Sequence, residues 1–415
     1  MSTGARRFGP ALVIAVLLGL LAPAGASAHA YLTGTAPAES SVLKMAPAHV
    51  ALSFDEAVDP RFAEVSVTDA AGRFEATGAP VRSPSNPDTL TVGLRRGLAR
   101  GWYLVYWRAI SVDGHPVQGS YTFAVGPRPG AQPQFRTPRL GGSATSADVL
   151  VPRWIMLASI MSAVGLWLFR TVLSRGLELG AGRRALNRAL VASTLVGLLA
   201  ALVYLDTTTA VDALRSPFAL GTLIPLYGAS PSGHAYLELA ICFALFSFAS
   251  WIAIWVDNDT GRRSVAELAA GAGAGLAAAG VLVLPGAGGH PGTTSPRGLS
   301  LTLDALHLLA GSLWLGGLTG LALLGRAGVS VLLPRFSRVA LSSVLVLFAT
   351  GVWASFYRLP TFGSLFHTGY GVTILVKVTL LVLALAPALV NRLRGAPRGV
   401  LSVEVAVVAA AVFAG

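Results

Sequence analysis

Long apolar segments dominate the chain after about residue 150, and they constrain its fold more than any other feature. An α-helix needs roughly 20 apolar residues to cross the hydrocarbon core of a bilayer. We count eight segments, which span 151–172, 185–205, 235–256, 265–284, 301–324, 339–356, 371–390 and 400–414. The chain is 53% hydrophobic and only 12% charged, which excludes an ordinary soluble protein. We therefore predict an α-helical polytopic membrane domain over 150–415 with about eight transmembrane helices, the last of them short for a span.

The N-terminus has the pattern of a secretory signal peptide. Arg6 and Arg7 precede a short apolar run at 11–21, and an Ala-Ser-Ala cleavage site occupies 26–28. A positive region, a short apolar region and small residues at the cut define such a signal. Cleavage after this site would expose the α-amino group of His29 and deliver the following residues outside the cell membrane.

The arginines give an independent indication of the orientation. If the N-terminal domain lies outside, the loops that fall inside carry most of the arginines, whereas the opposite loops carry only Arg215, Arg297 and Arg358. Cytoplasmic loops are enriched in Lys and Arg. The net charge of +12 is therefore explained by membrane topology, and we predict no nucleic-acid partner. The inner arginines are Arg170, Arg175, Arg183, Arg184, Arg262, Arg263, Arg326, Arg335, Arg338, Arg392, Arg394 and Arg398.

The region between the signal and the membrane domain has a different texture. Short segments alternate apolar and polar residues, at 50–54, 64–68, 89–92 and 103–107, and Pro, Gly, Asn and Asp separate them. Such spacing over about 100 residues predicts a small all-β, Ig-like sandwich. The predicted organisation is multi-domain: a signal peptide at 1–28, a sandwich at 29–125, a linker at 126–149 and the membrane domain at 150–415.

Three residues of the exported domain form a candidate metal site. The amine and ring of an N-terminal His29 can chelate a metal together. Asp113 and His115 are two residues apart, so in an extended segment they point to the same side. Three nitrogens and one carboxylate oxygen suit Cu(II). The alternative is that Asp113 begins an ordinary hairpin turn and His115 is merely its neighbour.

These residues also carry a family resemblance. His29 with the following Ala-Tyr-Leu, the segment at 37–40, and Ser-Val-Asp-Gly-His-Pro-Val-Gln-Gly at 111–119 resemble the CopC family of exported copper-resistance proteins. The resemblance implies a β-sandwich that binds Cu(II) through His29, Asp113 and His115. Some members of the family also carry a methionine-rich loop for Cu(I). Here Met45 is the only methionine of the domain, so no such loop is expected.

The membrane half places its histidines toward the outer side of the predicted topology. His290 lies in an outer loop, and His307 lies about two turns into the fifth span. Asp304 and His307 are three residues apart and share a helix face, so the carboxylate can orient the imidazole. We predict a copper path through His290 and His307, supported by Asp304. The alternative is that Asp304 is an interfacial first-turn residue and His307 a hydrogen-bonded residue of the bundle.

This half resembles the CopD family of inner-membrane copper proteins. The resemblance rests on Leu-Asp-Ala-Leu-His at 303–307, Trp-Leu-Gly-Gly-Leu at 314–318, and Thr350-Gly351. A CopC domain fused to a CopD domain is associated with copper uptake. Two local predictions concern helix packing: Ser264 and Glu267 form a capping box that opens the fourth span, and the Gly/Ala run at 271–280 allows close helix contact.

The combined prediction is a multi-pass protein of the cell membrane that captures Cu(II) outside and takes part in copper import, homeostasis or resistance. It is not predicted to be an enzyme, and no nucleotide-binding motif is visible. The partners are copper and the lipid bilayer, with a separate copper reductase or chaperone as a further partner. Three alternatives stay open: a copper monooxygenase, a haem-bearing membrane redox protein, and a copper sensor or chaperone without transport.

Overall fold

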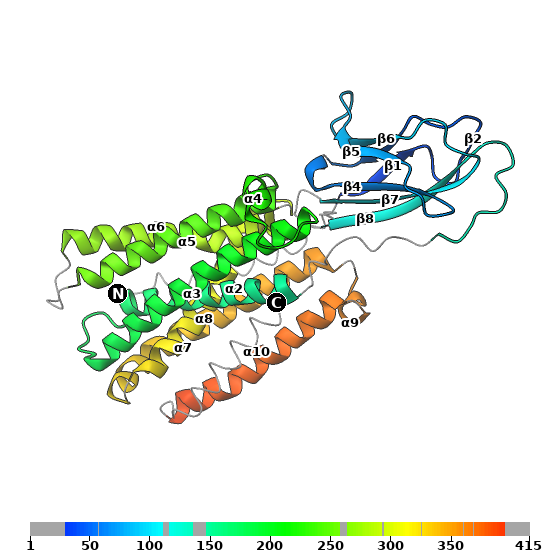
Figure 1. Cartoon of the computed structure of the whole chain (residues 1–415). Helices are drawn as coiled ribbons and strands as arrows, with labels where there is room; N and C mark the ends of the chain where they lie inside the picture. Colours follow the sequence, from blue (N-terminus) through cyan, green and yellow to red (C-terminus); the bar gives the residue numbers. More distant parts are fainter. Residues whose placement is uncertain are drawn as a thin grey trace.

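A β-sandwich lies at one end of a bundle of long helices (Figure 1). This computed structural model describes residues 30–56, 58–110, 116–135, 147–257, 264–292, 294–324, 326–359, 361–367 and 369–394. The sandwich followed by a helical membrane domain confirms the predicted fold class. The predicted signal peptide, His29, Asp113, His115 and the eighth apolar segment lie outside the described residues.

Eight strands build the sandwich. They are β1 (Leu32–Ala36), β2 (Val42–Leu43), β3 (His49–Phe54), β4 (Glu64–Asp69), β5 (Ala76–Arg82), β6 (Thr89–Leu94), β7 (Gly101–Ile110) and β8 (Pro116–Val125), with a 3₁₀ turn η1 at Pro60–Phe62. One sheet has the order β1-β3-β6-β5 and the other β2-β8-β7-β4. Each alternating segment recognised in the sequence lies in one of these strands, because its apolar positions face the space between the sheets.

Aromatic side chains fill that space. The rings of Tyr103 and Phe123 stack at 5.4 Å between their centroids, and those of Phe54 and Trp107 meet edge to face, also at 5.4 Å. Phe54 is on one sheet and Trp107 on the other, so this pair joins the two layers. Each buried aromatic ring contributes on the order of 2 kcal/mol by leaving water. His49, the first residue of β3, is exposed.

The bundle contains seven long helices among the described residues. They are α2 (Ala147–Leu168) with a π-turn η2 (Phe169–Leu173), α3 (Ala181–Asp212), α5 (Pro231–Trp255), α6 (Val265–Ala287), α7 (Arg297–Leu323), α8 (Arg326–Arg358) and α10 (Gly369–Arg394). Short helical turns between them are α4 (Leu220–Leu223), η3 (Ile224–Leu226), η4 (His290–Gly292) and α9 (Ser364–His367). Six of the long helices are apolar and long enough to cross a bilayer, and the described apolar part of α10 is shorter, Gly371–Leu383.

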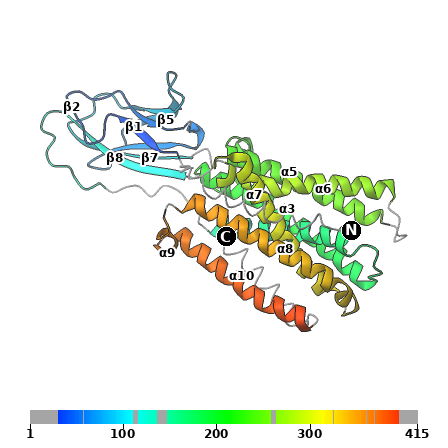
Figure 2. The ribbon, with the colours of Figure 1, turned by 180° about the vertical axis from the view of Figure 1, so that it is seen from behind.

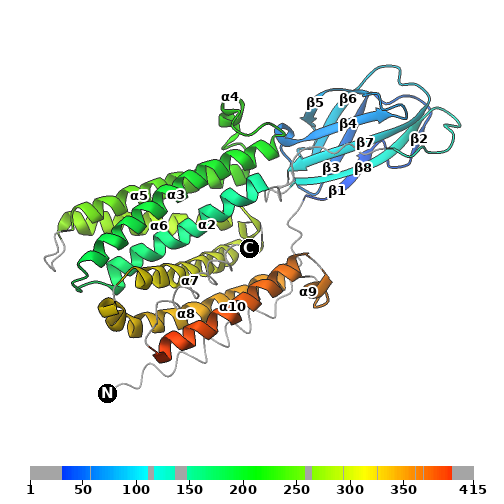
Figure 3. The ribbon, with the colours of Figure 1, turned by 60° about the horizontal axis from the view of Figure 1, so that its bottom comes forward.

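Helices α2 and α7 pack closely against each other at glycines. A Cβ on Gly165 of α2 would overlap the backbone of Ser312 and Gly316, so both helices need glycine at this crossing. Of the predicted close-packing run, Gly280 does pack against Cys242, but a Cβ on Gly271 would meet nothing within 4 Å. The prediction of close helix packing is therefore confirmed for most of the run, where Gly273, Gly275 and Gly280 have side-chain neighbours within 4 Å and Ala274 and Ala278 are buried. Helices α8 and α10 lie at the edge of the bundle (Figures 2 and 3).

The predicted capping box is present. Ser264 is the N-cap of α6, and its hydroxyl accepts a hydrogen bond from the backbone N–H of Glu267 at 3.1 Å. A side-chain oxygen in this position satisfies one of the backbone N–H groups that a helix leaves unpaired at its start. The carboxylate in the first turn also favours the positive end of the helix dipole.

Candidate functional site

The start of β1 and the hairpin between β7 and β8 lie at the same end of the sandwich. Leu32 pairs with Phe54 at the end of β3, and the Phe54 ring contacts Trp107 near the end of β7. Trp107 in turn pairs with Gly119 on β8. In the sequence, His29 directly precedes β1, and residues 111–115 connect β7 to β8. The predicted ligands His29, Asp113 and His115 are outside the described residues, and the described strand ends that adjoin them in the sequence lie at this end.

The first described residues are anchored firmly. Ala30 is only 5% exposed and belongs to the core of the sandwich. The backbone N–H of Tyr31 donates to the Asp55 carboxylate at 2.6 Å, and the N–H of Asp55 donates to the Tyr31 carbonyl at 3.0 Å. This reciprocal pair restrains the backbone immediately after His29.

The same end of the sandwich is docked on the bundle. Arg108 of β7 is 2% exposed, and its guanidinium donates to the carbonyls of Val211 and Asp212 at the end of α3, both at 3.1 Å. A cation at a helix C-terminus pairs with carbonyls that lack partners within the helix. Burial lowers the pKa of the Arg108 guanidinium and the Asp212 carboxylate raises it, while the group stays charged. Arg61 adds a hydrogen bond to the Ala229 carbonyl at 3.2 Å.

We call this region the docked end, which comprises residues 30–32, 54–55, 61, 107–110 and 116–119. The helices alternate in direction, so the end of α3 and the starts of α5, α7 and α10 lie at the same end of the bundle (Figure 1). His234 lies in the first turn of α5, His290 in η4 and His367 in α9, and all three positions are at this end of the bundle. The docked end therefore faces the part of the bundle where these histidines lie.

The ring of His307 is held by the neighbouring helix. Its Nδ1 lies 2.7 Å from the Thr350 Oγ1 of α8. The Thr350 hydroxyl donates its single hydrogen to the Val346 carbonyl at 2.7 Å. The hydroxyl therefore accepts from the imidazole, which assigns the proton of a neutral ring to Nδ1 and leaves the lone pair on Nε2. A lone pair on Nε2 is what metal coordination by a neutral histidine requires.

Asp304 lies against a different helix. A Cβ on Gly286 near the end of α6 would meet its Oδ2 at 2.5 Å, so the glycine makes room for the carboxylate. The structure thus brings Asp304 beside α6 and His307 beside α8, although both are on α7. The role of Asp304 in orienting His307 stays a prediction.

Sequence reasoning did not identify Asp206 as a buried carboxylate. It is 4% exposed, and it accepts hydrogen bonds from the Tyr227 hydroxyl at 2.7 Å and the Phe218 N–H at 2.9 Å. Burial and this hydrogen bond raise the pKa of Tyr227 to about 12. The segment predicted as a span ends at residue 205, whereas α3 continues to Asp212. These two hydrogen bonds fasten the loop after α3 to that helix, so we assign Asp206 a structural role.

Comparison with known proteins matches both halves. Residues 32–126 match the family model "CopC domain", and residues 330–413 match "Copper resistance protein D". Copper resistance protein C of Pseudomonas syringae pv. tomato is 38% identical over 112 residues, which cover 26% of this chain and 88% of that protein. The chain belongs to the CopC–CopD copper proteins.

Two further relatives extend the match. The Copper transport protein CutJ of Bacillus subtilis (strain 168) is 27% identical over 384 residues, which cover 90% of this chain and 69% of that protein. The crystal structure of CopC from Methylosinus trichosporium OB3b aligns over 26% of this chain and 100% of its own, at 28% identity and a TM-score of 0.22. The relatives with descriptive names are copper transport and copper resistance proteins.

The matched CopD segment contains only part of the candidate membrane site. It includes Thr350 and His367, whereas Asp304 and His307 precede it. Among the described residues, no three His, Cys, Asp or Glu side chains converge as a metal site. His234 instead pairs with Glu238 one turn along α5, at 3.0 Å between Nε2 and Oε1, with both side chains about half exposed. The described bundle of this CopC–CopD protein therefore offers separate candidate ligands, not a closed cage.

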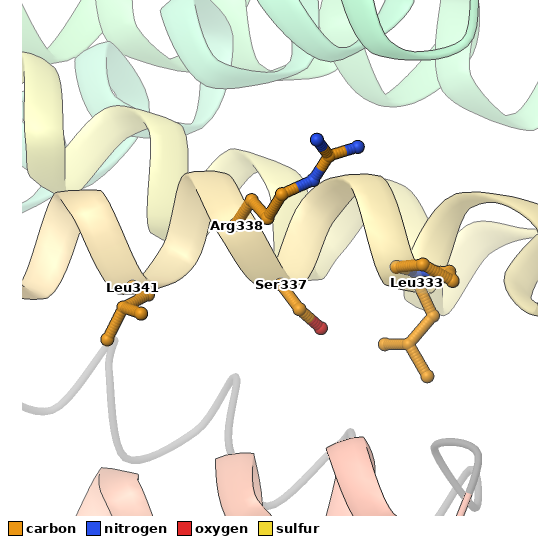
Figure 4. A pocket seen from close by; sticks show the side chains of 5 residues that line it. Leu333, Ser337, Arg338 and Leu341 are labelled. Carbon is orange, nitrogen blue, oxygen red and sulfur yellow. The ribbon is translucent and has the colours of Figure 1, made fainter. Parts of the chain in front are cut away.

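Salt bridges between side chains stabilise the opposite end of the CopC–CopD bundle. Asp257, just after α5, accepts from Arg170 at 2.5 Å and from Arg183 at 3.0 Å, two of the arginines predicted to lie inside. A pocket of about 310 Å³ lies on the half of α8 nearer this end, lined by Leu333, Pro334, Ser337, Arg338 and Leu341 (Figure 4). Its lining comes from one helix and contains no histidine, so it is separate from the candidate copper site.

Proposed function

We propose that this CopC–CopD protein captures Cu(II) outside the cell membrane and passes copper into its helical bundle for import. The observation that carries the proposal is the position of the docked end. The segments that hold His29, Asp113 and His115 begin there, and Arg108 fixes the same end to the tip of α3. Copper released from the sandwich would therefore start beside the bundle's histidines.

The capture chemistry follows from the ligand types. The amine and ring of an N-terminal His29 close a chelate, the ring of His115 adds a third nitrogen, and Asp113 adds an oxygen. This set of nitrogen and oxygen ligands favours Cu(II), the cupric cargo. None of these residues supplies a reducing equivalent, so a separate reductase or chaperone is the expected partner if copper changes oxidation state. The proposed activity is that of a carrier and not of an enzyme.

The transfer chemistry rests on His307. Its Nδ1 contacts Thr350, so Nε2 is the ring nitrogen that would meet the cargo. Conduction requires binding that is favourable enough to admit an ion and weak enough to release it. A succession of single ligands meets this requirement better than a closed cage. The relative from Bacillus subtilis is described as a copper transport protein, which supports import as the outcome.

Copper accumulation in intact cells tests the proposal. We expect wild-type protein to raise accumulation from Cu(II), and His29→Ala and His115→Ala each to abolish most of the increase. His49→Ala is the matched control, because His49 is exposed at the start of β3, away from the docked end. Purified full-length protein should show a cupric EPR signal with nitrogen hyperfine structure.

Three outcomes would contradict import by this route. Tight Cu(II) binding with no accumulation would favour a sensor or chaperone. Copper-dependent oxidation of a polymer substrate in the presence of reductant would favour a monooxygenase. A Soret band in the purified protein would favour a haem-bearing redox protein, which needs two facing axial ligands within the bundle.

A further inference from the structure

Two methionines lie inside the first span of the bundle. Met156 is 1% exposed and Met161 is 9% exposed, and both are on α2. They differ in what they face. The thioether of Met161 reaches α7, where a Cβ on Gly311 would lie 2.5 Å from its Cε and 3.8 Å from its Sδ. Because Gly311 has no side chain, the end of the Met161 side chain can occupy this space.

The position of Gly311 relates this thioether to His307. The two residues are four apart on α7, so they lie on one face, one turn from each other. One turn corresponds to about 6 Å along the axis. The His307 ring is fixed from the side by Thr350. An imidazole and a thioether therefore follow one another along α7, with the thioether deeper in the bundle.

Ser343 of α8 supplies an independent observation. It is seven residues from Thr350, which contacts His307, and seven from Phe336, whose ring packs on Gly317. These contacts place Ser343 on the same α8 face, between the levels of His307 and Gly317 on α7. Its side chain is 3% exposed, and its Oγ has no hydrogen-bond partner among the described residues. A buried polar atom without a protein partner needs an explanation, and this oxygen is therefore a candidate contact for a water or ion.

We propose that Met161 is a thioether ligand for cuprous ion, one helical turn inward of His307. The inference rests on the proposed function and deepens it by naming the second ligand of the path and the oxidation state it selects. Thioether sulfur is a soft ligand and favours Cu(I) over Cu(II), in contrast to the ligands of the exported domain. Ser343 lies at the same depth and offers an oxygen to a hydrated ion. Both side chains are uncharged, so neither binds the ion as tightly as a thiolate.

The competing explanation is that Met161 only fills space between α2 and α7, as methionines do in many cores. Substitution by leucine separates the two roles, since Met-to-Leu exchange conserves volume and usually costs less than about 1.5 kcal/mol. Met156→Leu is the matched control, because it makes the same exchange at a buried position of the same helix. Both variants carry Met45→Leu, which removes the exposed thioether of the sandwich.

The test measures copper in two ways. Cells are supplied with copper and ascorbate, so that the ion is Cu(I), and accumulation is compared between variants. We expect Met161→Leu to lower accumulation by about tenfold or more, the scale on which even outer-shell changes weaken metal sites, and Met156→Leu to leave it within twofold. Full-length protein loaded with Cu(I) should show a copper–sulfur contribution in X-ray absorption that Met161→Leu removes.

Each result decides the inference. Equal accumulation and equal copper–sulfur signals in the two leucine variants would overturn it. Absence of a copper–sulfur signal in the parent protein would overturn it as well, and this measurement does not depend on how a variant folds. If the wild type accumulates no copper, the proposed import fails, whereas a copper–sulfur signal that requires Met161 would still support the ligand.

Discussion

The docked end of the sandwich and the outer half of the bundle present their candidate ligands in different ways. In the sandwich, the described ends of β1, β7 and β8, which adjoin the three predicted ligands in the sequence, lie at one end, beside a backbone anchored by Asp55. In the bundle, the His307 ring contacts Thr350 of α8, and Asp304 lies beside a different helix, α6. A site with several convergent ligands suits capture, and separate ligands suit release. Under the proposed function, capture and transfer would therefore belong to different halves of one chain.

The largest expected effect separates these two tasks. His115→Ala should weaken Cu(II) affinity by at least about 100-fold, since changes to outer-shell groups alone cost 10- to 100-fold. His307→Ala should leave Cu(II) affinity unchanged and lower accumulation in cells. Titration of purified full-length protein followed by EPR measures the first quantity, and cellular copper measures the second. Loss of Cu(II) affinity in His307→Ala would show that the halves do not divide the work.

The next effect tests whether the halves must stay in contact. Arg108→Met removes two charge-assisted hydrogen bonds to α3, and the docking should lose about 3 kcal/mol. Cu(II) affinity should persist, whereas accumulation should fall several-fold and hydrogen exchange at the end of α3 should rise. Arg61→Ala is the control, because that side chain is 55% exposed and its loss should change little. Unchanged accumulation in Arg108→Met would mean that transfer does not need docking.

A smaller effect concerns the orientation of His307. Thr350→Val removes the oxygen that accepts from Nδ1 and should cost about 1 kcal/mol, roughly a fivefold loss of accumulation. Thr350→Ser keeps the oxygen and should restore most of the activity. Nitrogen-15 NMR of the labelled imidazole should show the Nδ1–H tautomer in the wild type. The same tautomer in Thr350→Val, with normal accumulation, would contradict a positioning role.

The sequence predicted the elements better than the contacts between them. Alternation with period two located the strands, and apolar length located the spans, because both signals are local. The spacing of Asp304 and His307 showed that they share a face of α7. Their partners could not be predicted, since Thr350 is 43 residues away from His307 and reaches it only through the pairing of α7 with α8.

Arg108 and Gly165 show the same limit. A charged residue within a long apolar strand, such as Arg108, indicates in the sequence that a polar partner is present. The partners themselves could not be predicted, because the acceptors on α3 are more than 100 residues away. The close crossing of α2 and α7 uses Gly165, a single glycine in an apolar segment, whereas one glycine of the conspicuous run at 271–280, Gly271, meets no neighbour within 4 Å. Packing depends on which helix faces which, and composition carries no information about that.

The smallest expected effect concerns His234, in the first turn of α5. His234 is paired with Glu238 within one helix, and its side chain is 61% exposed, so the pair is screened and contributes little to stability. If transfer passes through His307, then His234→Ala should change accumulation by less than about twofold, because only the histidine fixed across two helices holds a defined geometry. Measuring both alanine variants in the same cells ranks them directly. A loss of copper accumulation in His234→Ala as large as in His307→Ala would place the copper path on α5 as well. Contact of a histidine ring with a neighbouring helix would then not distinguish a transfer ligand from a histidine in a surface ion pair.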